Sequence, residues 1–348
     1  MKKHIVLAAA VSTVLAGGIM TGGETAYAAG NGPNYQGHET VNTSILHTYE
    51  EMTNFLKKQD AKQPSMELEV FGETVKGRDM HLVKYMSDPD NPTILYIAQQ
   101  HGDEALTTEG SLDFIKQLGT GKTRGLLDDV NLLFIPMYNA DGAMGDVNFE
   151  LEDYAASGDR HLTRMNADRV DLNRDHEARS QPETQAFHDN VLSTYDINYM
   201  IDLHHQGSQW EKDGKYVSGA ILYPHPDHTE DETLYESKQL GGIVYEAIEP
   251  KGWGHLGKYA GGGTAYDQGI GVYGIANTYG ISTLLFEMRG TADNANDDEV
   301  LGQKSNGYLT KQTVETLSAT SRAVADGTIE GQDISFWEDL PVQTEREE

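Results

Sequence analysis

The sequence predicts one α/β domain with a mixed, largely parallel central sheet flanked by helices. Two observations predict this class. Apolar runs of strand length recur along the chain, and segments with helical apolar spacing lie between them. No internal repeat or strong linker divides the 348 residues, and a chain of this length can bury a sizeable core.

The first half of the chain alternates predicted helices and strands. A helix is predicted where apolar side chains recur every three or four residues, and a strand where they alternate or run on continuously. The predicted elements are, in order, a helix over 44–58, strands over 66–70, 80–86 and 93–98, a helix over 107–118 and a strand over 131–137. The polar stretch 145–180 has little periodicity, and a loop of that length in a compact domain is usually functional or disordered.

The second half continues the alternation. Its predicted elements are a helix over 182–195, strands over 197–203 and 219–223, a helix over 232–248, a strand over 281–288 and a helix over 310–325. The Gly-rich, aromatic stretch 251–280 is predicted to be loop-like. In sheets of this class, functional sites gather where loops leave the carboxyl ends of the strands.

The N-terminus has the pattern of an export signal. Lys2 and Lys3 precede an apolar run over 5–20, and Ala26-Tyr27-Ala28 suits cleavage after a small residue. We therefore expect a signal peptide over 1–28 and a secreted, extracellular protein; the alternative is an uncleaved anchor. A loose lead-in over 29–43, the folded domain over 44–326 and an acidic tail over 327–348 are predicted to follow.

Composition excludes several classes of protein and site. With 26 basic and 55 acidic residues the net charge is −29, which argues against binding to nucleic acid or an anionic membrane. No second apolar stretch is long enough to span a bilayer, so no membrane association is expected after signal cleavage. The absence of cysteine excludes disulfides, thiolate metal sites and a cysteine nucleophile.

A possible metal site follows the strand over 93–98, in the sequence Gln-Gln-His-Gly-Asp-Glu. His101 and Glu104 are three residues apart, so an imidazole and a carboxylate can face one point. His204, two residues after Asp202 at the end of another predicted strand, is the expected third ligand. His205 is the rival, since adjacent strand residues face opposite ways. Two histidines and one carboxylate suit a catalytic zinc that keeps a position open.

Further polar groups lie in and after the long polar stretch. Asn173 and Arg174 together can grip a carboxylate, since a guanidinium donates two parallel hydrogen bonds and an amide adds another. Asp171, two residues earlier, can orient a metal-bound histidine. Arg164 is a candidate for stabilising an oxyanion; its competitors, close to it in the sequence, are Arg160 and Arg169.

Glu287 is the only charged residue in the strand Ile-Ser-Thr-Leu-Leu-Phe-Glu-Met. A buried carboxylate costs free energy unless it is paired or functional. Beside a metal, a raised pKa would let Glu287 take a proton from bound water and return it to a leaving group. The alternative is a structural ion pair with Arg289.

The order of these groups resembles that of the zinc carboxypeptidases of the carboxypeptidase A/B type (funnelins). The resemblance rests on His101-x-x-Glu104, Asn173-Arg174, Asp202-x-His204 and a strand-borne Glu287, and covers roughly residues 44–325. It implies an α/β sandwich around a mixed eight-stranded sheet. The activity it implies is removal of the C-terminal residue from peptides.

The resemblance also implies roles for individual residues. It implies one zinc ion per chain on His101, Glu104 and His204, with Asp171 behind His101. Arg164 would stabilise the oxyanion, Asn173 and Arg174 would bind the substrate carboxylate, and Glu287 would be general base and acid. The family's mobile tyrosine precedes a small, Gly-rich run; strict spacing here puts Lys258 in its place, so Tyr259 is assigned with a shift of one residue.

The sequence therefore predicts a secreted zinc metallocarboxypeptidase, a monomer, that acts through a zinc-bound water on peptides with a free C-terminal carboxylate. An alternative is a zinc amidohydrolase of the same fold acting on acylated amino acids or cell-wall peptide branches. A non-catalytic binding module is a third, and Glu287 argues against it, because a binder needs no buried base. The side-chain preference and the physiological substrate stay open.

Overall fold

The computed structural model describes residues 46–123, 125–149, 162–207, 209–260, 265–289 and 303–345. The described residues all belong to one compact unit. The signal peptide predicted over 1–28 and the lead-in over 29–43 lie outside them, and so does Arg160. None of the described helices is long and apolar enough to cross a bilayer.

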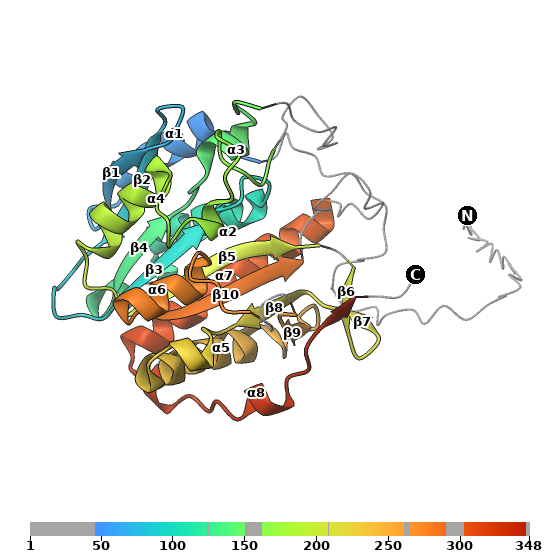
Figure 1. The fold of residues 1–348 in the computed structure, drawn as a ribbon. Coiled ribbons are helices and arrows are strands. Elements are labelled where there is room, and N and C mark those ends of the chain that lie inside the picture. The colour runs from blue at the N-terminus through green and yellow to red at the C-terminus, as the bar shows by residue number, and fades with distance from the viewer. Residues whose placement is uncertain are drawn as a thin grey trace, which may run out of the picture. The chain divides into compact units, whose positions relative to one another are not determined.

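An eight-stranded sheet forms the centre of the fold (Figure 1). In spatial order its strands are β1 (Glu67–Glu73), β2 (Asp79–Tyr85), β4 (Asn131–Ile135), β3 (Thr93–Ala98), β5 (Tyr199–Gln206), β10 (Ser282–Arg289), β8 (Gly219–Leu222) and β9 (Leu256–Lys258). The four central strands, β4, β3, β5 and β10, run parallel, and antiparallel pairs join them to β2 and to β8. The predicted mixed, largely parallel sheet is confirmed.

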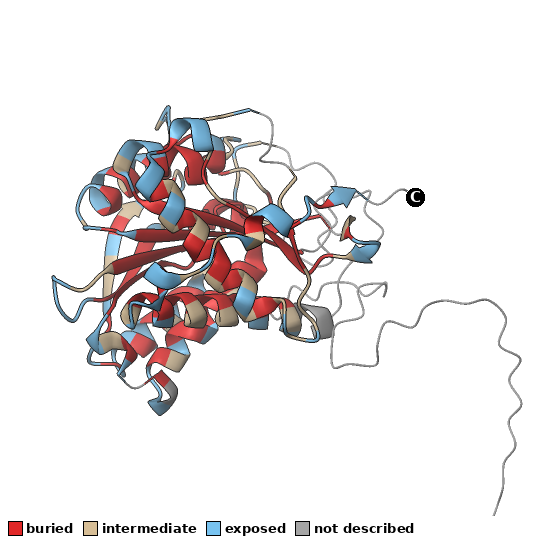
Figure 2. Ribbon diagram, turned by 90° about the horizontal axis from the view of Figure 1, so that it is seen from below, coloured by how far each residue is buried: buried red, intermediate tan, exposed pale blue. Residues whose placement is uncertain are grey.

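Helices cover both faces of this sheet. One face packs against α1 (Tyr49–Asp60), α2 (Ala105–Leu118), α5 (Asp231–Ile248) and α7 (Gln303–Ala325). The other face packs against α6 (Gly271–Tyr279) and against α4 (Pro182–Ala186), which continues as a π-helix over Phe187–Leu192. The four central strands of the sheet are buried and the edge strand β1 is partly exposed, while the helices are exposed on their outward sides (Figure 2).

Alternation along the strands assigns each side chain to one of the two faces. Ile94 and Tyr96 pack toward α2 and α7, whereas Leu95 and Ile97 pack toward the opposite layer. The same rule separates Leu203 from Met200 on β5. A polar side chain at the end of a strand therefore points to the same face of the sheet as the apolar residues two and four positions before it.

Two segments differ from the sequence-based expectation. The stretch 251–280, expected as a loop, contains β9 and α6, so that prediction was wrong. Glycines within α6 and at both of its ends made the stretch look like a loop in the sequence. A Cβ at Gly274 would collide with the backbone of Gln268, so close packing requires glycine there. The second segment is the acidic tail predicted over 327–348. Its described residues, 327–345, pack against the domain, and buried Trp337 donates through Nε1 to the Lys238 carbonyl at 2.9 Å.

Candidate active site

The polar groups predicted at strand ends meet at the carboxyl edge of β3, β5 and β10. β3 ends at Ala98, and a short turn delivers His101 and Glu104 before α2 begins at Ala105. Gln99 holds this turn, with a positive φ of 55° and its Nε2 donating to the Gly102 carbonyl at 2.7 Å. On β5, His204 lies one residue beyond Leu203, the partner of Ala98.

Three possible metal ligands, His101, Glu104 and His204, lie together at this edge of the sheet. His101 Nδ1 lies 2.8 Å from Glu104 Oε1, and His204 Nδ1 lies 2.9 Å from Glu104 Oε2. The two Nδ1 atoms are 3.1 Å apart. One ligand atom from each residue falls within 4.8 Å of the other two, and all three side chains are buried. Two imidazole nitrogens and one carboxylate are the donor set that catalytic zinc takes.

A carboxylate stands behind each histidine. Asp171 Oδ1 lies 3.1 Å from His101 Nε2, and Asp202 Oδ2 lies 3.0 Å from His204 Nε2. Each carboxylate favours the tautomer that leaves Nδ1 free to bind a cation. The sequence predicted Asp171 in this place. A supporting role for Asp202 was not predicted, although the spacing Asp202-x-His204 indicates it, since residues two apart on a strand share a face.

The charges of this cluster favour a cation. Burial disfavours ionisation of Glu104, but His101 and His204 outweigh it and hold the pKa of Glu104 well below its ordinary range. Burial also opposes protonation of His204, yet Asp202 and Glu104 raise its pKa well above the usual value. A group of side chains that attracts protons in this way is equally suited to hold a metal ion.

Arg164 borders the same cluster. Its Nε donates to Asp171 Oδ2 at 3.0 Å, and its Nη1 lies 3.9 Å from Glu104 Oε1. Its side chain is 40% exposed, so part of the guanidinium faces solvent beside the donor group. The rival Arg169 instead lies over the ring of Phe149, 5.5 Å from its centroid. The structure thus places Arg164, and not Arg169, where a developing negative charge could be met.

Glu287 lies on β10 opposite His204 in the parallel pairing with β5. The residue is 7% exposed, and its Oε2 has no hydrogen-bond partner among the described residues. Burial, reinforced by Glu104, raises the pKa of Glu287 to about 7, against the opposing effect of His204. No ion pair joins it to Arg289 within the described part of the chain. Arg289 instead lies over the Tyr216 ring, 4.3 Å from its centroid.

Asn173 and Arg174 point in different directions. Asn173 is buried; its Oδ1 accepts from the Gly271 amide at 2.7 Å, and its Nδ2 lies 3.4 Å from His204 Nε2. Arg174 is 45% exposed; its Nη1 donates to the Asn173 carbonyl at 2.7 Å, and its Nε lies 3.9 Å from Asp267 Oδ2. The structure therefore turns the Asn173 amide inward and leaves Arg174 as the exposed cation of the pair.

Tyr259 lies in an apolar cluster. It is half-buried, and the buried members of the cluster are Leu222, Val272, Tyr273 and Leu285. Leu285 shares a strand face with Glu287, two residues away, so this cluster lies along the same face of β10. The Gly-rich residues 261–264 that follow Tyr259 lie outside the described residues.

His205 belongs to the opposite face of the sheet. It follows Leu203 by two residues, and Leu203 packs in the layer of α2 and α7. Burial lowers the pKa of His205 to about 4, and neither of its ring nitrogens has a hydrogen-bond partner among the described residues. Of the two adjacent histidines, only His204 reaches the donor group.

Comparison with known proteins gives one family. The family model for zinc carboxypeptidases matches residues 52–293, more than half of the chain. A zinc carboxypeptidase from Saccharothrix mutabilis subsp. capreolus is 29% identical over 111 residues, which cover 29% of this chain and only 26% of that protein.

Solved carboxypeptidases share the fold. The carboxypeptidase A of Helicoverpa armigera aligns with a TM-score of 0.64 at 18% identity, over 84% of this chain and 77% of that one. A metallo-carboxypeptidase from Burkholderia cenocepacia aligns with a TM-score of 0.59 at 20% identity, over 81% and 70%. With the family match over most of the folded region, and with two histidines and a glutamate gathered at the edge of the sheet, this chain belongs to the zinc carboxypeptidase family.

Proposed function

We propose that this chain is a metallocarboxypeptidase that hydrolyses the C-terminal peptide bond of peptides. The observation that carries the proposal is Glu287, a buried carboxylate on the strand next to His204, whose Oε2 has no hydrogen-bond partner in the described part of the structure. A protein that only binds peptides has no need of a buried base whose pKa is raised to about 7.

His101, Glu104 and His204 would hold the zinc ion. Bound there, zinc supplies a Lewis acid and lowers the pKa of a water molecule toward neutrality. Asp171 and Asp202 hold the two imidazoles with Nδ1 turned inward. Glu287, whose pKa is raised by burial, accepts a proton from the attacking water and delivers it to the leaving amine.

Two arginines would act on the substrate. Arg174 presents an exposed guanidinium beside the site, suited to the free α-carboxylate of a peptide. Arg164, held by Asp171, faces the developing oxyanion and stabilises its charge. Since the Asn173 amide is turned inward, recognition of the chain end rests mainly on Arg174.

A pair of peptides tests this proposal. The protein should release the last residue of a peptide with a free C-terminus and leave the same peptide intact when its C-terminus is amidated. Similar cleavage of both would refute the exopeptidase activity. Cleavage of an acylated amino acid or a branched cell-wall peptide, but not of linear peptides, would favour the amidohydrolase instead.

We further propose that the protein acts outside the cell. The support is the pattern of residues 1–28, with Lys2 and Lys3 ahead of an apolar run and a small-residue step at Ala26-Tyr27-Ala28. Mass spectrometry of protein from the culture medium should find a chain that begins at Ala29. Retention of the whole chain inside the cells would contradict export.

A further inference from the structure

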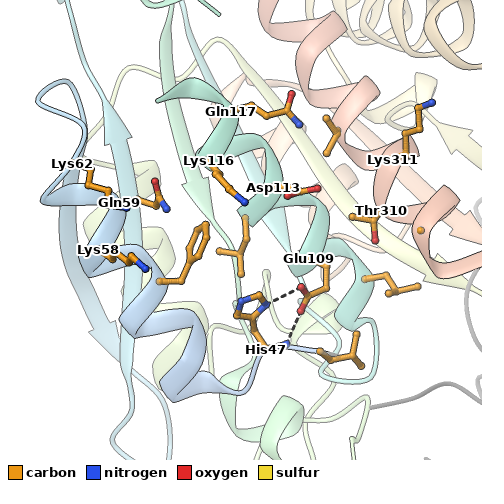
Figure 3. A pocket seen from close by; sticks show the side chains of 16 residues that line it. His47, Lys58, Gln59, Lys62, Glu109, Asp113, Lys116, Gln117, Thr310 and Lys311 are labelled. Carbon is orange, nitrogen blue, oxygen red and sulfur yellow. Dashed lines mark hydrogen bonds and ion pairs between the residues drawn. The ribbon is translucent and has the colours of Figure 1, made fainter. Parts of the chain in front are cut away.

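A hollow of about 720 Å³ lies among three helices (Figure 3), and none of its lining residues belongs to the candidate active site. α1, α2 and α7 line it, together with Leu46 and His47. These helices pack on the sheet face opposite to the one that carries His204 and Glu287. The hollow is therefore a separate feature, with a volume typical of sites for small ligands or a few side chains.

The lining has an apolar floor. Phe55 from α1, Leu106 and Leu112 from α2, and Val314 from α7 contribute to it. The polar side chains of Gln117 and Thr310 also line the hollow and can bond to peptide groups. Glu109 is already engaged by His47, whose backbone amide and Nδ1 contact the carboxylate at 2.6 and 2.8 Å.

Lysines surround this floor. Lys58 projects from α1, Lys62 from the turn that follows α1, and Lys116 from α2, around the same hollow (Figure 3). The lysine ion pairs of the described residues are made by Lys76, Lys84, Lys212 and Lys251, and none involves these three ammonium groups. Lys311, the fourth lysine of the lining, is directed to the ring of Trp253 at 5.6 Å.

This concentration of positive charge contrasts with the chain as a whole. The protein has a net charge of −29, so its average field repels anions. Among the residues that line the hollow, Lys58, Lys62 and Lys116 are exposed and Asp113 is the one exposed acid, so the lining forms a local site of opposite sign. Charge complementarity thus selects an anionic ligand, and the floor of Phe55, Leu112 and Val314 selects one that also carries apolar groups.

We propose that this hollow binds an acidic peptide segment with apolar side chains. The carboxylates of such a segment would meet Lys58, Lys62 and Lys116, and its apolar side chains would pack on the floor between the helices. A bare inorganic anion would use the lysines but leave the floor exposed. The site does not depend on the proposed peptidase activity, because none of its residues belongs to the candidate active site.

The test uses the zinc-loaded, full-length protein and a short peptide of glutamates interrupted by leucines, acetylated and amidated so that it lacks a free terminus. Wild type should bind it, more weakly as salt rises, since the Debye length is about 10 Å at 0.1 M. Lys58→Gln with Lys62→Gln should weaken binding about tenfold. Lys116→Gln, on another helix, should also weaken it, so the result does not depend on the fold of α1.

Two matched variants serve as controls. Lys57→Gln alters the same helix outside the hollow, and Arg174→Ala alters the candidate active site; both should bind the peptide as wild type does. Equal binding of a glutamate peptide without leucines, or competition by inorganic phosphate at the same concentration, would overturn the proposal in favour of a simple anion site. Loss of binding in Lys57→Gln or in Arg174→Ala would overturn it as well.

Discussion

Glu287 on β10 lies directly opposite His204 on β5, in a parallel pairing in which both side chains leave the same face of the sheet. The expected metal ligand and the expected base are thus held by two rigid neighbouring strands. Asp202 and Leu285 form the next pair on that face. Asp202 contacts His204 through its carboxylate, and Leu285 precedes Glu287 on the same face of β10. This relationship leads to the first two predictions.

Replacement Glu287→Gln should keep the shape of the side chain and remove the base. Turnover should fall by about 10²–10⁴-fold, the usual contribution of a placed general base, while the bound zinc stays. Steady-state kinetics and elemental analysis of the same preparation measure the two effects. Near-normal turnover with full zinc content would remove Glu287 from the mechanism.

The pH profile of wild type should reflect ionisation of Glu287. Burial raises its pKa to about 7, and a bound cation pulls that value down, so the acidic limb of kcat/KM should lie at or below about 7. Because only the carboxylate accepts a proton, activity should fall as the pH drops through this limb. A profile of kcat/KM that is flat from pH 5 to 8 would be inconsistent with this role.

Zinc binding should separate the two adjacent histidines. His204→Ala and His101→Ala remove a nitrogen that lies within 3 Å of the Glu104 carboxylate, so we expect chains depleted of zinc. His205→Ala alters the opposite face of the sheet. This variant should retain about one zinc per chain, because His101, Glu104 and His204 are unchanged. Metal content measured after dialysis decides the matter, and an empty site in His205→Ala alone would reverse the assignment.

Asn173 and Arg174 should behave differently, although they are neighbours. Arg174→Ala should lower kcat/KM on a free peptide about ten- to a hundred-fold, because a hydrogen bond to a charged group contributes about 1.5–3 kcal/mol. Arg174→Lys should also be impaired, since an ammonium lacks the planar fork. Asn173→Ala should instead disturb the contacts with Gly271 and His204 and weaken zinc binding. Equal zinc affinity in both variants would contradict the inward role of Asn173.

Two buried, hydrogen-bonded histidines, His176 and His188, predict that the folded protein loses stability in acid. His176 Nδ1 lies 3.1 Å from His188 Nε2, and His188 Nδ1 lies 2.8 Å from the Tyr279 hydroxyl. Burial lowers the pKa of His188 to about 3, with His176 and Arg179 adding to the effect. Between that value and the ordinary 6.5 only the unfolded chain binds the proton, so stability is complete above about 6.5 and falls as the pH drops.

The contribution of His188 can be measured by denaturant unfolding. Between pH 7 and pH 5 one such histidine should cost wild type on the order of 2 kcal/mol of unfolding free energy. His188→Gln cannot take up this proton, so its stability should depend less steeply on pH, whatever its absolute stability. An unchanged slope would show that His188 titrates normally in the folded chain.

Much of the fold was predictable because it rests on local patterns. The central strands and most flanking helices follow from apolar periodicity, and the polar residues at strand ends mark the edge where a site forms. Helix α6 was not predicted because Gly271 and Gly274 lower helix propensity. Only tertiary packing explains these glycines. A Cβ on Gly271, for example, would lie 3.2–3.3 Å from His176 Nε2, Asn173 Oδ1 and Asp202 Oδ2. The hollow among α1, α2 and α7 was equally hidden, since its lysines come from separate elements.

The sequence by itself determined which chemical groups are available: two imidazoles and a carboxylate at strand ends, one acid in a buried strand and an adjacent amide and guanidinium. The tertiary structure decided between neighbours. It turned His204 and not His205 to the donor group, placed Arg164 and not Arg169 beside it, and directed the Asn173 amide inward while Arg174 stayed exposed. The reason is physical: residue types fix the chemistry a side chain can perform, but strand parity and the packing of distant elements fix the direction in which it points.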